Sequence, residues 1–303
     1  RGRDAAAFLD RIMTNDMASI RPGMARYTVM CQPDGGCVDD LIVYRFSETE
    51  FLICLNASNA AKDIAWMRSL IGPFKVEVLD ECAAWAQLAL QGPRAEAILA
   101  LATATPLASI KRFGFVFGEV AGVAGCLISR TGYTGSPGFE IYLPAASAEK
   151  VARALLELGK PHGLVPAGLG ARDSLRLEAN YPLYGHEISE QISPIQAGLG
   201  WTVKFTKPEF IGREALHRQA QGGPISSVVL FSLDDRRIAR QGAVVYSGET
   251  PVGEVLSGTQ SPVLGKPIGT ALVAAGHAAS ASLTVDIRGH RIPLRLATEP
   301  FVK

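Results

Sequence analysis

The sequence predicts an α+β fold over residues 1–204, followed by a small antiparallel β-barrel over residues 205–303. In the first part, short strand-like runs alternate with helical periodicity and hairpin turns, which favours α+β over a parallel Rossmann sheet. No glycine-rich dinucleotide fingerprint follows any of these strands, because Gly168-Leu169-Gly170 is too short to be one. The pattern changes after about Lys204, and residues 225–303 hold six short strands at regular spacing without helical periodicity. This second part has no charge cluster typical of catalysis and is interpreted as a companion domain.

Each expected element rests on its local pattern. Apolar residues recur at helical spacing over residues 4–13, behind a possible Asp4 N-cap. Asp34-Gly35-Gly36 predicts a hairpin turn between strands at 27–30 and 41–44. Further strands are expected at 51–55, 76–79 and 86–90, and helices at 59–70, 95–101 and 170–179. The barrel strands are expected at 228–233, 243–246, 252–256, 268–273, 283–287 and 292–296.

The composition excludes several classes of function. The 303 residues carry a formal net charge of +1, which argues against nucleic acid or an anionic membrane as the main partner. No apolar stretch is long enough to cross a bilayer, and the start at Arg1 shows no signal peptide. The five cysteines lack Cys-x-x-Cys spacing and are expected to be small buried residues in a reducing compartment. The five histidines are scattered, so no metal site is expected.

Two aspartates, Asp39 and Asp40, stand between the double glycine and the apolar run Leu41 to Tyr44. Burying charged groups there is costly, which favours a functional role for at least one of them. Successive strand side chains point to opposite faces, so the pair cannot act as a dyad on one substrate atom. One is expected to face a cleft and the other solvent or a backbone cap. A solvated hairpin turn remains the simpler interpretation of these eight residues alone.

A second polar stretch runs from Arg130 to Tyr142 and contains three glycines that permit tight turns. Strand alternation places Phe139 and Ile141 on one face, and Glu140 with Tyr142 on the other. A carboxylate at Glu140 could accept two N–H bonds from a planar heterocycle with an amidine edge. An ordinary exposed strand glutamate is the alternative.

Two further stretches carry polar side chains near each other in the sequence. In the helix expected at 170–179, Arg172 and Arg176 share a face at i, i+4, with Asp173 close to both. Two guanidiniums suit either a carboxylate-bearing ligand or an internal carboxylate. The loop 180–188 is polar, aromatic and non-periodic, which favours a site over a core element. His186 within it is more typical of a satisfied loop histidine than of a base.

Together these stretches resemble the T-protein of the glycine cleavage system, the tetrahydrofolate-dependent aminomethyltransferase family. Any one motif is weak, but many in the same order are specific. The resemblance extends over essentially the whole chain and includes residues 34–41, 56–66, 130–142, 168–178, 183–188, 210–216 and 257–262.

The resemblance implies a folate-binding aminomethyltransferase fold of two α+β subdomains, followed by a C-terminal antiparallel β-barrel, with folate in a central cavity. By position, Asp39 matches the family's catalytic carboxylate near N5 and N10, and Asp40 becomes scaffold. Glu140 matches the acid that grips the pterin ring. Residues matching the cavity lining or the tail site are Tyr27, Asn56, Tyr133, Arg172 and Tyr184.

The resemblance also implies the reaction and its partners. A lipoylated H-protein presents an aminomethyl group on a lipoyl sulfur, and tetrahydrofolate is the co-substrate that accepts the carbon as ammonia departs. The expected location is the bacterial cytoplasm, or the mitochondrial matrix in a eukaryote. The family carries several dozen residues before the first helix that this sequence does not contain, so part of the cavity lining is expected to be missing. This sequence also has Ser136-Pro137 where the family commonly has a more acidic pair in the glycine-rich strand.

Relatives of the same fold leave two alternatives open. Folate-dependent demethylases or methyltransferases take a methyl group from a sulfur or oxygen donor and need no H-protein. Folate-binding iron–sulfur assembly proteins are non-catalytic and carry a Lys-Gly-Cys loop, where this chain has Leu183-Tyr184-Gly185. The flavin-linked dehydrogenases are disfavoured because no flavin-domain motif is present. Fold alone does not choose between these functions.

Overall fold

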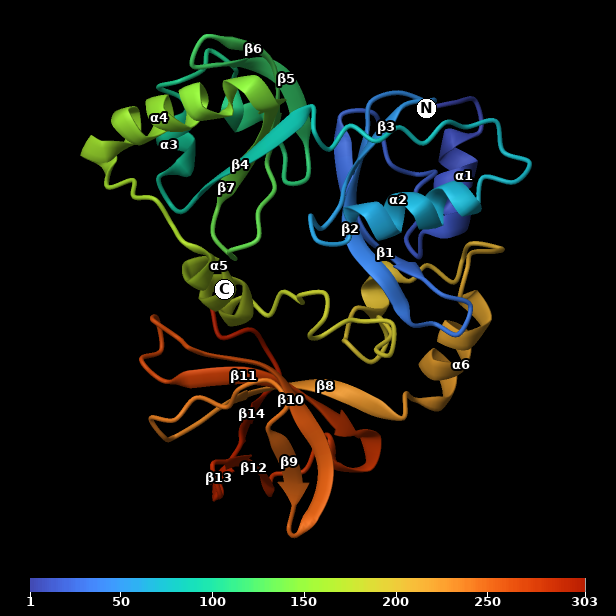
Figure 1. Cartoon of the computed structure of the whole chain (residues 1–303), viewed down its shortest axis with the longest axis vertical. Helices are drawn as coiled ribbons and strands as arrows, with labels where there is room; N and C mark the ends of the chain where they lie inside the picture. The colour runs from blue at the N-terminus through green and yellow to red at the C-terminus, as the bar shows by residue number, and fades with distance from the viewer. Residues whose placement is uncertain (303) are drawn as a thin grey trace. The chain divides into compact units, whose positions relative to one another are not determined.

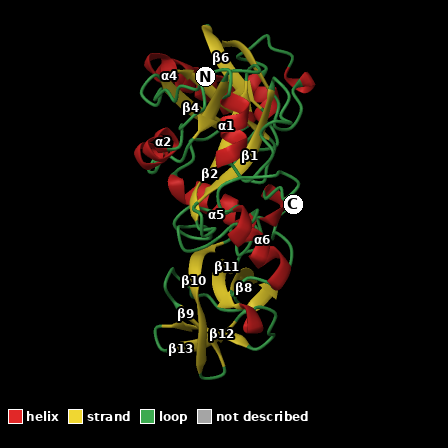
Figure 2. Cartoon of the chain, turned by 90° about the vertical axis from the view of Figure 1, so that its right-hand side faces the viewer, coloured by secondary structure: helices red, strands yellow, loops and turns green. Residues whose placement is uncertain are grey.

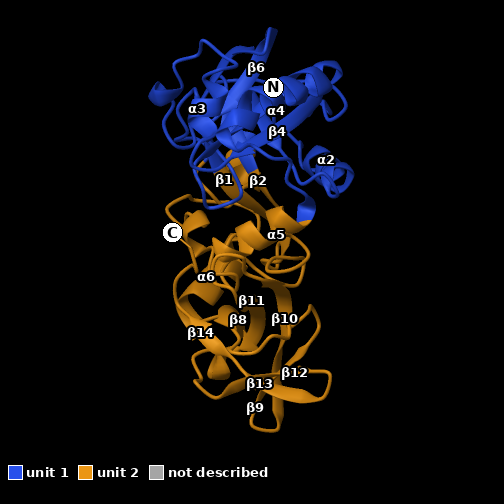
Figure 3. Cartoon of the chain, turned by 90° about the vertical axis from the view of Figure 1, so that its left-hand side faces the viewer, with its two compact units in different colours: residues 1–8, 17–26, 42–169 blue, residues 9–16, 27–41, 170–303 orange. Residues whose placement is uncertain are grey.

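The structure is a computed structural model that describes residues 1–302 (Figure 1). It divides into two compact units, coloured separately in Figure 3. Unit 1 comprises residues 1–8, 17–26 and 42–169, and unit 2 comprises residues 9–16, 27–41 and everything from residue 170 onward. The predicted boundary between residues 204 and 205 lies inside unit 2.

The N-terminal part forms two helices and a three-stranded sheet in the order β1-β2-β3. The expected elements at 4–13, 27–30, 51–55 and 59–70 are confirmed with shifted ends. Their bounds are α1 Ala5–Ile12, β1 Met24–Cys31, β2 Cys37–Arg45, β3 Phe51–Cys54 and α2 Ala60–Ser69.

Strand β2 begins earlier than the apolar run at 41–44 predicted, so both aspartates lie inside the strand. The turn closes tightly because Gln32 N donates to the carbonyl of Gly36 at 2.8 Å and Gly35 adopts a φ of +95°. Glycine reaches this backbone region at no steric cost. The chain is therefore already extended at Cys37, and the aspartates become strand residues with alternating environments.

A four-stranded antiparallel sheet in the order β4-β7-β6-β5 forms the rest of the regular structure in unit 1 (Figure 1). Helices α3 and α4 pack on one face of it, where Ile98 and Val151 join Phe139 and Ile141 in one apolar cluster. The strand at 86–90 and the helix at 95–101 are confirmed. The bounds are β4 Trp85–Gln91, α3 Ala95–Leu99, β5 Phe115–Val120, β6 Val123–Ser129, β7 Gly138–Pro144 and α4 Ala148–Gly159.

The strand predicted at 76–79 is wrong. This segment joins no sheet. Its backbone groups bond elsewhere: Glu77 N donates to the carbonyl of Arg1 at 2.7 Å, and the Arg68 guanidinium donates to the carbonyl of Val78 at 3.0 Å. A period-2 pattern marks extended backbone, and here hydrogen bonds to the N-terminus and a side chain replace a ladder.

The C-terminal segment folds as one curled antiparallel sheet of seven strands in the order β13-β12-β9-β10-β11-β8-β14 (Figure 2). One strand was expected at 292–296, but it is two, because β13 pairs with β12 and β14 pairs with β8. Since these end strands are adjacent in sequence around buried Leu294, the sheet must curl its two ends toward each other. The bounds are β8 Ser226–Ser232, β9 Val244–Ser247, β10 Thr250–Gln260, β11 Pro267–Ala274, β12 Leu283–Ile287, β13 His290–Pro293 and β14 Arg295–Ala297.

Two helices of unit 2 precede this sheet, α5 Leu169–Glu178 and α6 Arg213–Gly222. Three cysteines are buried as expected, but Cys82 is exposed and Cys54 half-buried. Among the described residues, no helix has the length and apolar character needed to cross a membrane. Over the same part of the chain, no group of three or more His, Cys, Asp or Glu side chains could hold a metal ion.

Candidate active site

The two aspartates of β2 occupy different environments. The Asp39 side chain has no exposed surface, whereas Asp40 is half-buried and accepts a hydrogen bond from the Tyr27 hydroxyl at 2.9 Å. This difference matches the alternation expected of neighbouring strand residues. The solvated-turn interpretation is therefore wrong for Asp39. A carboxylate that is buried on a strand is costly and is a candidate for function.

Tyr27 links Asp40 to the rest of unit 2. Its ring stacks on Trp201, with centroids 5.8 Å apart and an interplanar angle of 28°. Behind it, the Asn15 side-chain amide donates to the Tyr27 carbonyl at 3.0 Å, and Asn15 N donates to the Thr28 hydroxyl at 3.1 Å. Tyr27 is thus held both through its ring and through its backbone carbonyl.

A buried lysine holds the segment that contains Asn15. The Lys207 ammonium donates to the carbonyls of Asp10, Met13 and Asn15 at 2.5, 2.7 and 2.9 Å, and lies 3.3 Å from the Asp10 carboxylate. Burial lowers the pKa of Lys207, while the Asp10 carboxylate opposes that shift. Sequence inspection did not single out Lys207, because its acceptors are backbone carbonyls that leave no motif.

Tyr184 approaches the same hairpin from the loop at 180–188. Its hydroxyl donates to the carbonyl of Cys37, two residues before Asp39, at 3.3 Å. The Cys37 side chain is fully buried, and burial, with Cys31 beside it, raises the pKa of the Cys37 thiol. A thiol that keeps its proton is a poor nucleophile, which disfavours Cys37 as a reactive group.

The two arginines of α5 do not act as a pair. Arg172 is exposed, but Arg176 is 1% exposed and contacts the carboxylates of Asp173 at 2.8 Å and Glu187 at 2.7 Å. Arg176 also donates to the Ser257 hydroxyl at 2.8 Å. Of the two uses left open by the sequence, Arg176 therefore serves internal carboxylates. Arg172 lies on the exposed first half of α5.

His186 is a satisfied loop histidine, as the sequence favoured. Its Nδ1 lies 2.8 Å from the carbonyl oxygen of Leu256. Because a carbonyl only accepts, Nδ1 carries the hydrogen in this arrangement.

The second acidic candidate, Glu140, lies on β7 in unit 1 and is 8% exposed. Its Oε1 accepts from the Gln87 side-chain amide at 2.8 Å, and its Oε2 accepts from the Thr131 hydroxyl at 2.5 Å. The exposed-glutamate alternative is therefore wrong. The predicted alternation is confirmed, because Phe139 and Ile141 belong to the apolar cluster on the other face.

Two tyrosines extend the polar cluster around Glu140. The hydroxyls of Tyr44 and Tyr142 lie 3.0 Å apart, and their rings meet edge to face at 5.4 Å. Burial raises the pKa of both hydroxyls, with the nearby Glu140 charge adding to the shift. Both groups therefore stay protonated and can donate. Sequence inspection missed Gln87, Thr131 and Tyr44, because their proximity depends on strand register that the sequence alone did not fix.

The remaining predicted residues of unit 1 lie in loops. Asn56 follows β3 and Tyr133 follows β6, and both are half-buried. The loop of Tyr133 packs around Gln91, whose amide donates to the carbonyls of Thr131 and Phe139. A Cβ at Gly132 would lie 1.9 Å from the Gln91 amide oxygen, so a larger residue there would displace the Gln91 side chain.

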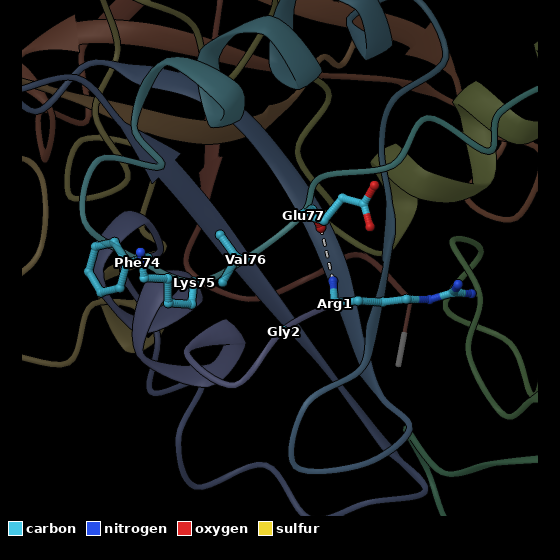
Figure 4. Close-up of a pocket in the computed structure, with 6 residues that line it drawn as sticks. All are labelled: Arg1, Gly2, Phe74, Lys75, Val76 and Glu77. Carbon is cyan, nitrogen blue, oxygen red and sulfur yellow. Dashed lines mark hydrogen bonds between the residues drawn. The ribbon is translucent and has the colours of Figure 1, made fainter.

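One surface hollow of unit 1, about 400 Å³ in volume, is lined by Arg1, Gly2 and residues 74–77 (Figure 4). The Arg1 ammonium donates to the Glu77 carbonyl across it at 3.0 Å. Its lining includes none of the predicted site residues and no convergent buried polar groups. We therefore assign no site to it.

Comparison with known proteins gives the class and then the family. Residues 1–207 match the family model described as GCVT N-terminal domain, and residues 227–303 match the Glycine cleavage T-protein C-terminal barrel domain. The chain thus has both parts of a glycine cleavage T-protein. It is 46% identical to an aminomethyltransferase of Desulforamulus reducens, covering 100% of this chain and 83% of the relative. It is 47% identical to one from Geobacillus kaustophilus, covering 100% and 84%.

A solved structure supports the same assignment. The glycine cleavage system aminomethyltransferase T from Bartonella henselae superposes with a TM-score of 0.91 at 33% identity, covering 99% of this chain and 82% of that one. The chain belongs to the aminomethyltransferase family of the glycine cleavage system. The fold class predicted from the sequence is confirmed, with the barrel present as a curled half-barrel.

Proposed function

We propose that Asp39 is the catalytic carboxylate with which this aminomethyltransferase of the glycine cleavage system acts on tetrahydrofolate. Family membership makes the chain a transferase of the aminomethyl carbon. The observation that carries the proposal is the complete burial of a carboxylate on β2, on a hairpin fixed through Tyr27 and Tyr184. A buried charge in a fixed position can stabilise charge that develops in a reaction.

The proposed reaction joins two bound reactants. The folate nitrogen N5 takes the carbon from the lipoyl-bound aminomethyl group, ammonia leaves, and the lipoyl arm is released as dihydrolipoyl. Asp39 orients the folate nitrogens and stabilises positive charge at N5. Orienting two reactants can lower the barrier by several kcal/mol. Asp40, held by Tyr27, keeps the strand in place.

Glu140 is proposed to bind the pterin ring. Its carboxylate accepts from the Gln87 amide at 2.8 Å and from the Thr131 hydroxyl at 2.5 Å, and these two bonds set its orientation. A carboxylate so placed can still accept the two N–H groups of an amidine edge in a charge-assisted arrangement. We assign Tyr27, Asn56, Tyr133 and Tyr184 to the cavity lining, and exposed Arg172 to the acidic tail.

A lipoylated H-protein is the proposed donor, and the bacterial cytoplasm is the proposed location, because the relatives named above are bacterial proteins. We also propose a domain boundary at residues 204 and 205, which the family matches at 1–207 and 227–303 support. The relatives named above are aminomethyltransferases, so nothing favours the demethylase or assembly-protein alternatives.

The test is an assay with tetrahydrofolate and aminomethylated H-protein that follows ammonia and methylene-tetrahydrofolate. We expect Asp39→Ala to remain folded by circular dichroism and to lose ~100-fold or more in turnover, since it removes a preorganised charge. Asp40→Ala is the matched neighbour and should lose far less. Wild-type rates in Asp39→Ala with loss in Asp40→Ala would reverse the assignment. If the wild type forms neither ammonia nor methylene-tetrahydrofolate but transfers methyl from a sulfonium or aryl ether, the demethylase alternative is established.

A further inference from the structure

A glutamine on β4 holds the carboxylate that we assign to the pterin ring. In the β4–β7 ladder, Gln87 pairs with Tyr142, and Ala89 pairs with Glu140. Paired residues share a face of the sheet, and so do residues two apart on one strand. Gln87 therefore lies on the same face as Tyr142 and diagonally across from Glu140, at a spacing that long side chains bridge.

The Gln87 amide uses both of its hydrogens within this cluster. Its nitrogen donates to Glu140 Oε1 at 2.8 Å and to the Tyr142 hydroxyl at 3.1 Å. Its oxygen accepts from the Cys54 thiol, with 3.7 Å between sulfur and oxygen. A flipped amide would place its oxygen against the carboxylate oxygen, so the ionised Glu140 selects the observed orientation. Every polar atom of this side chain therefore has a defined partner.

Burial separates Gln87 from the groups that it holds. Glu140 is 8% exposed and Tyr142 is 5% exposed, whereas Gln87 belongs to the exposed residues of β4. A deeply buried structural network would include the glutamine as well. Gln87 is thus a member of this cluster that reaches the surface of unit 1.

We propose that Gln87 is a positioning residue for folate: with Thr131 it fixes the plane of the Glu140 carboxylate, so that the pterin meets an oriented acceptor pair. Gln87 anchors Oε1 and Thr131 anchors Oε2, so the carboxylate cannot rotate without losing one of the two bonds. Pre-orientation of this kind improves binding by reducing the ordering cost on association. The inference rests on the proposed function, in which Glu140 binds the pterin.

The test measures tetrahydrofolate affinity and turnover in Gln87→Leu, with Gln221→Leu as control. Gln221 is an exposed glutamine on α6. We expect Gln87→Leu to raise the KM and the calorimetric Kd for tetrahydrofolate ~10-fold, as expected for losing a hydrogen bond to a charged group. The kcat should stay within about twofold, because Asp39 is unchanged, and the control should match the wild type. A purely structural role would lower the free energy of unfolding and leave KM unchanged, which would overturn the inference.

A double variant separates this inference from the proposed function. If Gln87 acts through Glu140, then Gln87→Leu adds little to the loss in a Glu140→Gln background, because the two residues are coupled. Full additivity overturns the positioning role. If Glu140→Gln alone leaves tetrahydrofolate affinity unchanged, the pterin assignment of Glu140 itself fails. If Gln87→Leu does not fold, Gln87→Glu replaces it in the test, because glutamate keeps the shape of the side chain. Its carboxylate beside that of Glu140 should weaken folate binding relative to the wild type.

Discussion

Replacing Lys207 by methionine tests how strongly one buried cation organises the segment behind the proposed catalytic hairpin. Methionine keeps the length and apolar character of the side chain but removes the ammonium, which serves three carbonyls and the Asp10 carboxylate. Each buried acceptor that loses its donor costs about 1–3 kcal/mol. Relief from burying an ammonium, itself several kcal/mol, offsets part of this sum. We expect a net loss of about 3 kcal/mol in the free energy of unfolding.

Urea denaturation followed by circular dichroism measures this loss as a shift in midpoint at constant slope. Lys111→Met is the control, because Lys111 is exposed and should change stability by less than about 0.5 kcal/mol. Asn15, which Lys207 holds, donates to the carbonyl of Tyr27 and to the hydroxyl of Thr28, so turnover of the folded variant should also fall. A Lys207→Met protein as stable and active as the control would refute the reasoning.

Two further predictions follow from packing and from burial. Gly36→Ala should destabilise the protein by about 2 kcal/mol or more in thermal unfolding, because the new Cβ would lie 1.9 Å from the carbonyl oxygen of Glu190. Gly276→Ala is the control and should be neutral, because its Cβ would meet no atom within 4 Å. The stability of the wild type should fall by about 1.4 kcal/mol per pH unit per tyrosine above pH ~10, since unfolded tyrosines ionise there while burial raises the pKa of Tyr44 and Tyr142. Tyr44→Phe should reduce that slope in alkaline denaturation, and an unchanged slope would contradict the assignment.

The sequence predicted those elements whose local pattern and tertiary pairing agree. The helix at the N-terminus, the hairpin and most barrel strands were recovered because apolar periodicity reports which face packs. The prediction failed at residues 76–79, whose backbone bonds to Arg1 and to the Arg68 side chain and pairs with no strand. The prediction also merged β13 with β14, because no local sequence pattern indicates that buried Leu294 lies between the two end strands of one sheet.

The candidate site divides in the same way. Asp39 and Glu140 became candidates because a carboxylate beside apolar strand residues is costly to bury, and the resemblance to the T-protein family then selected them. Gln87 and Lys207 did not, since glutamine and lysine are ordinary surface residues whose partners here are set by strand register or by backbone carbonyls. The sequence left Arg176 open between ligand and internal carboxylate, and only its burial beside Glu187 decides it.

The strand order of the C-terminal sheet has a consequence for biosynthesis. β8 is made first of the seven strands, yet its two neighbours are β11 and β14, both of which come later in the chain. While the ribosome adds residues one at a time, one edge of β8 stays unpaired until β11 has emerged, and the other stays unpaired until β14 has emerged. An unpaired apolar strand invites pairing with other chains. Nascent chains halted before residue 295 should therefore aggregate or bind chaperones more than chains that extend past β14.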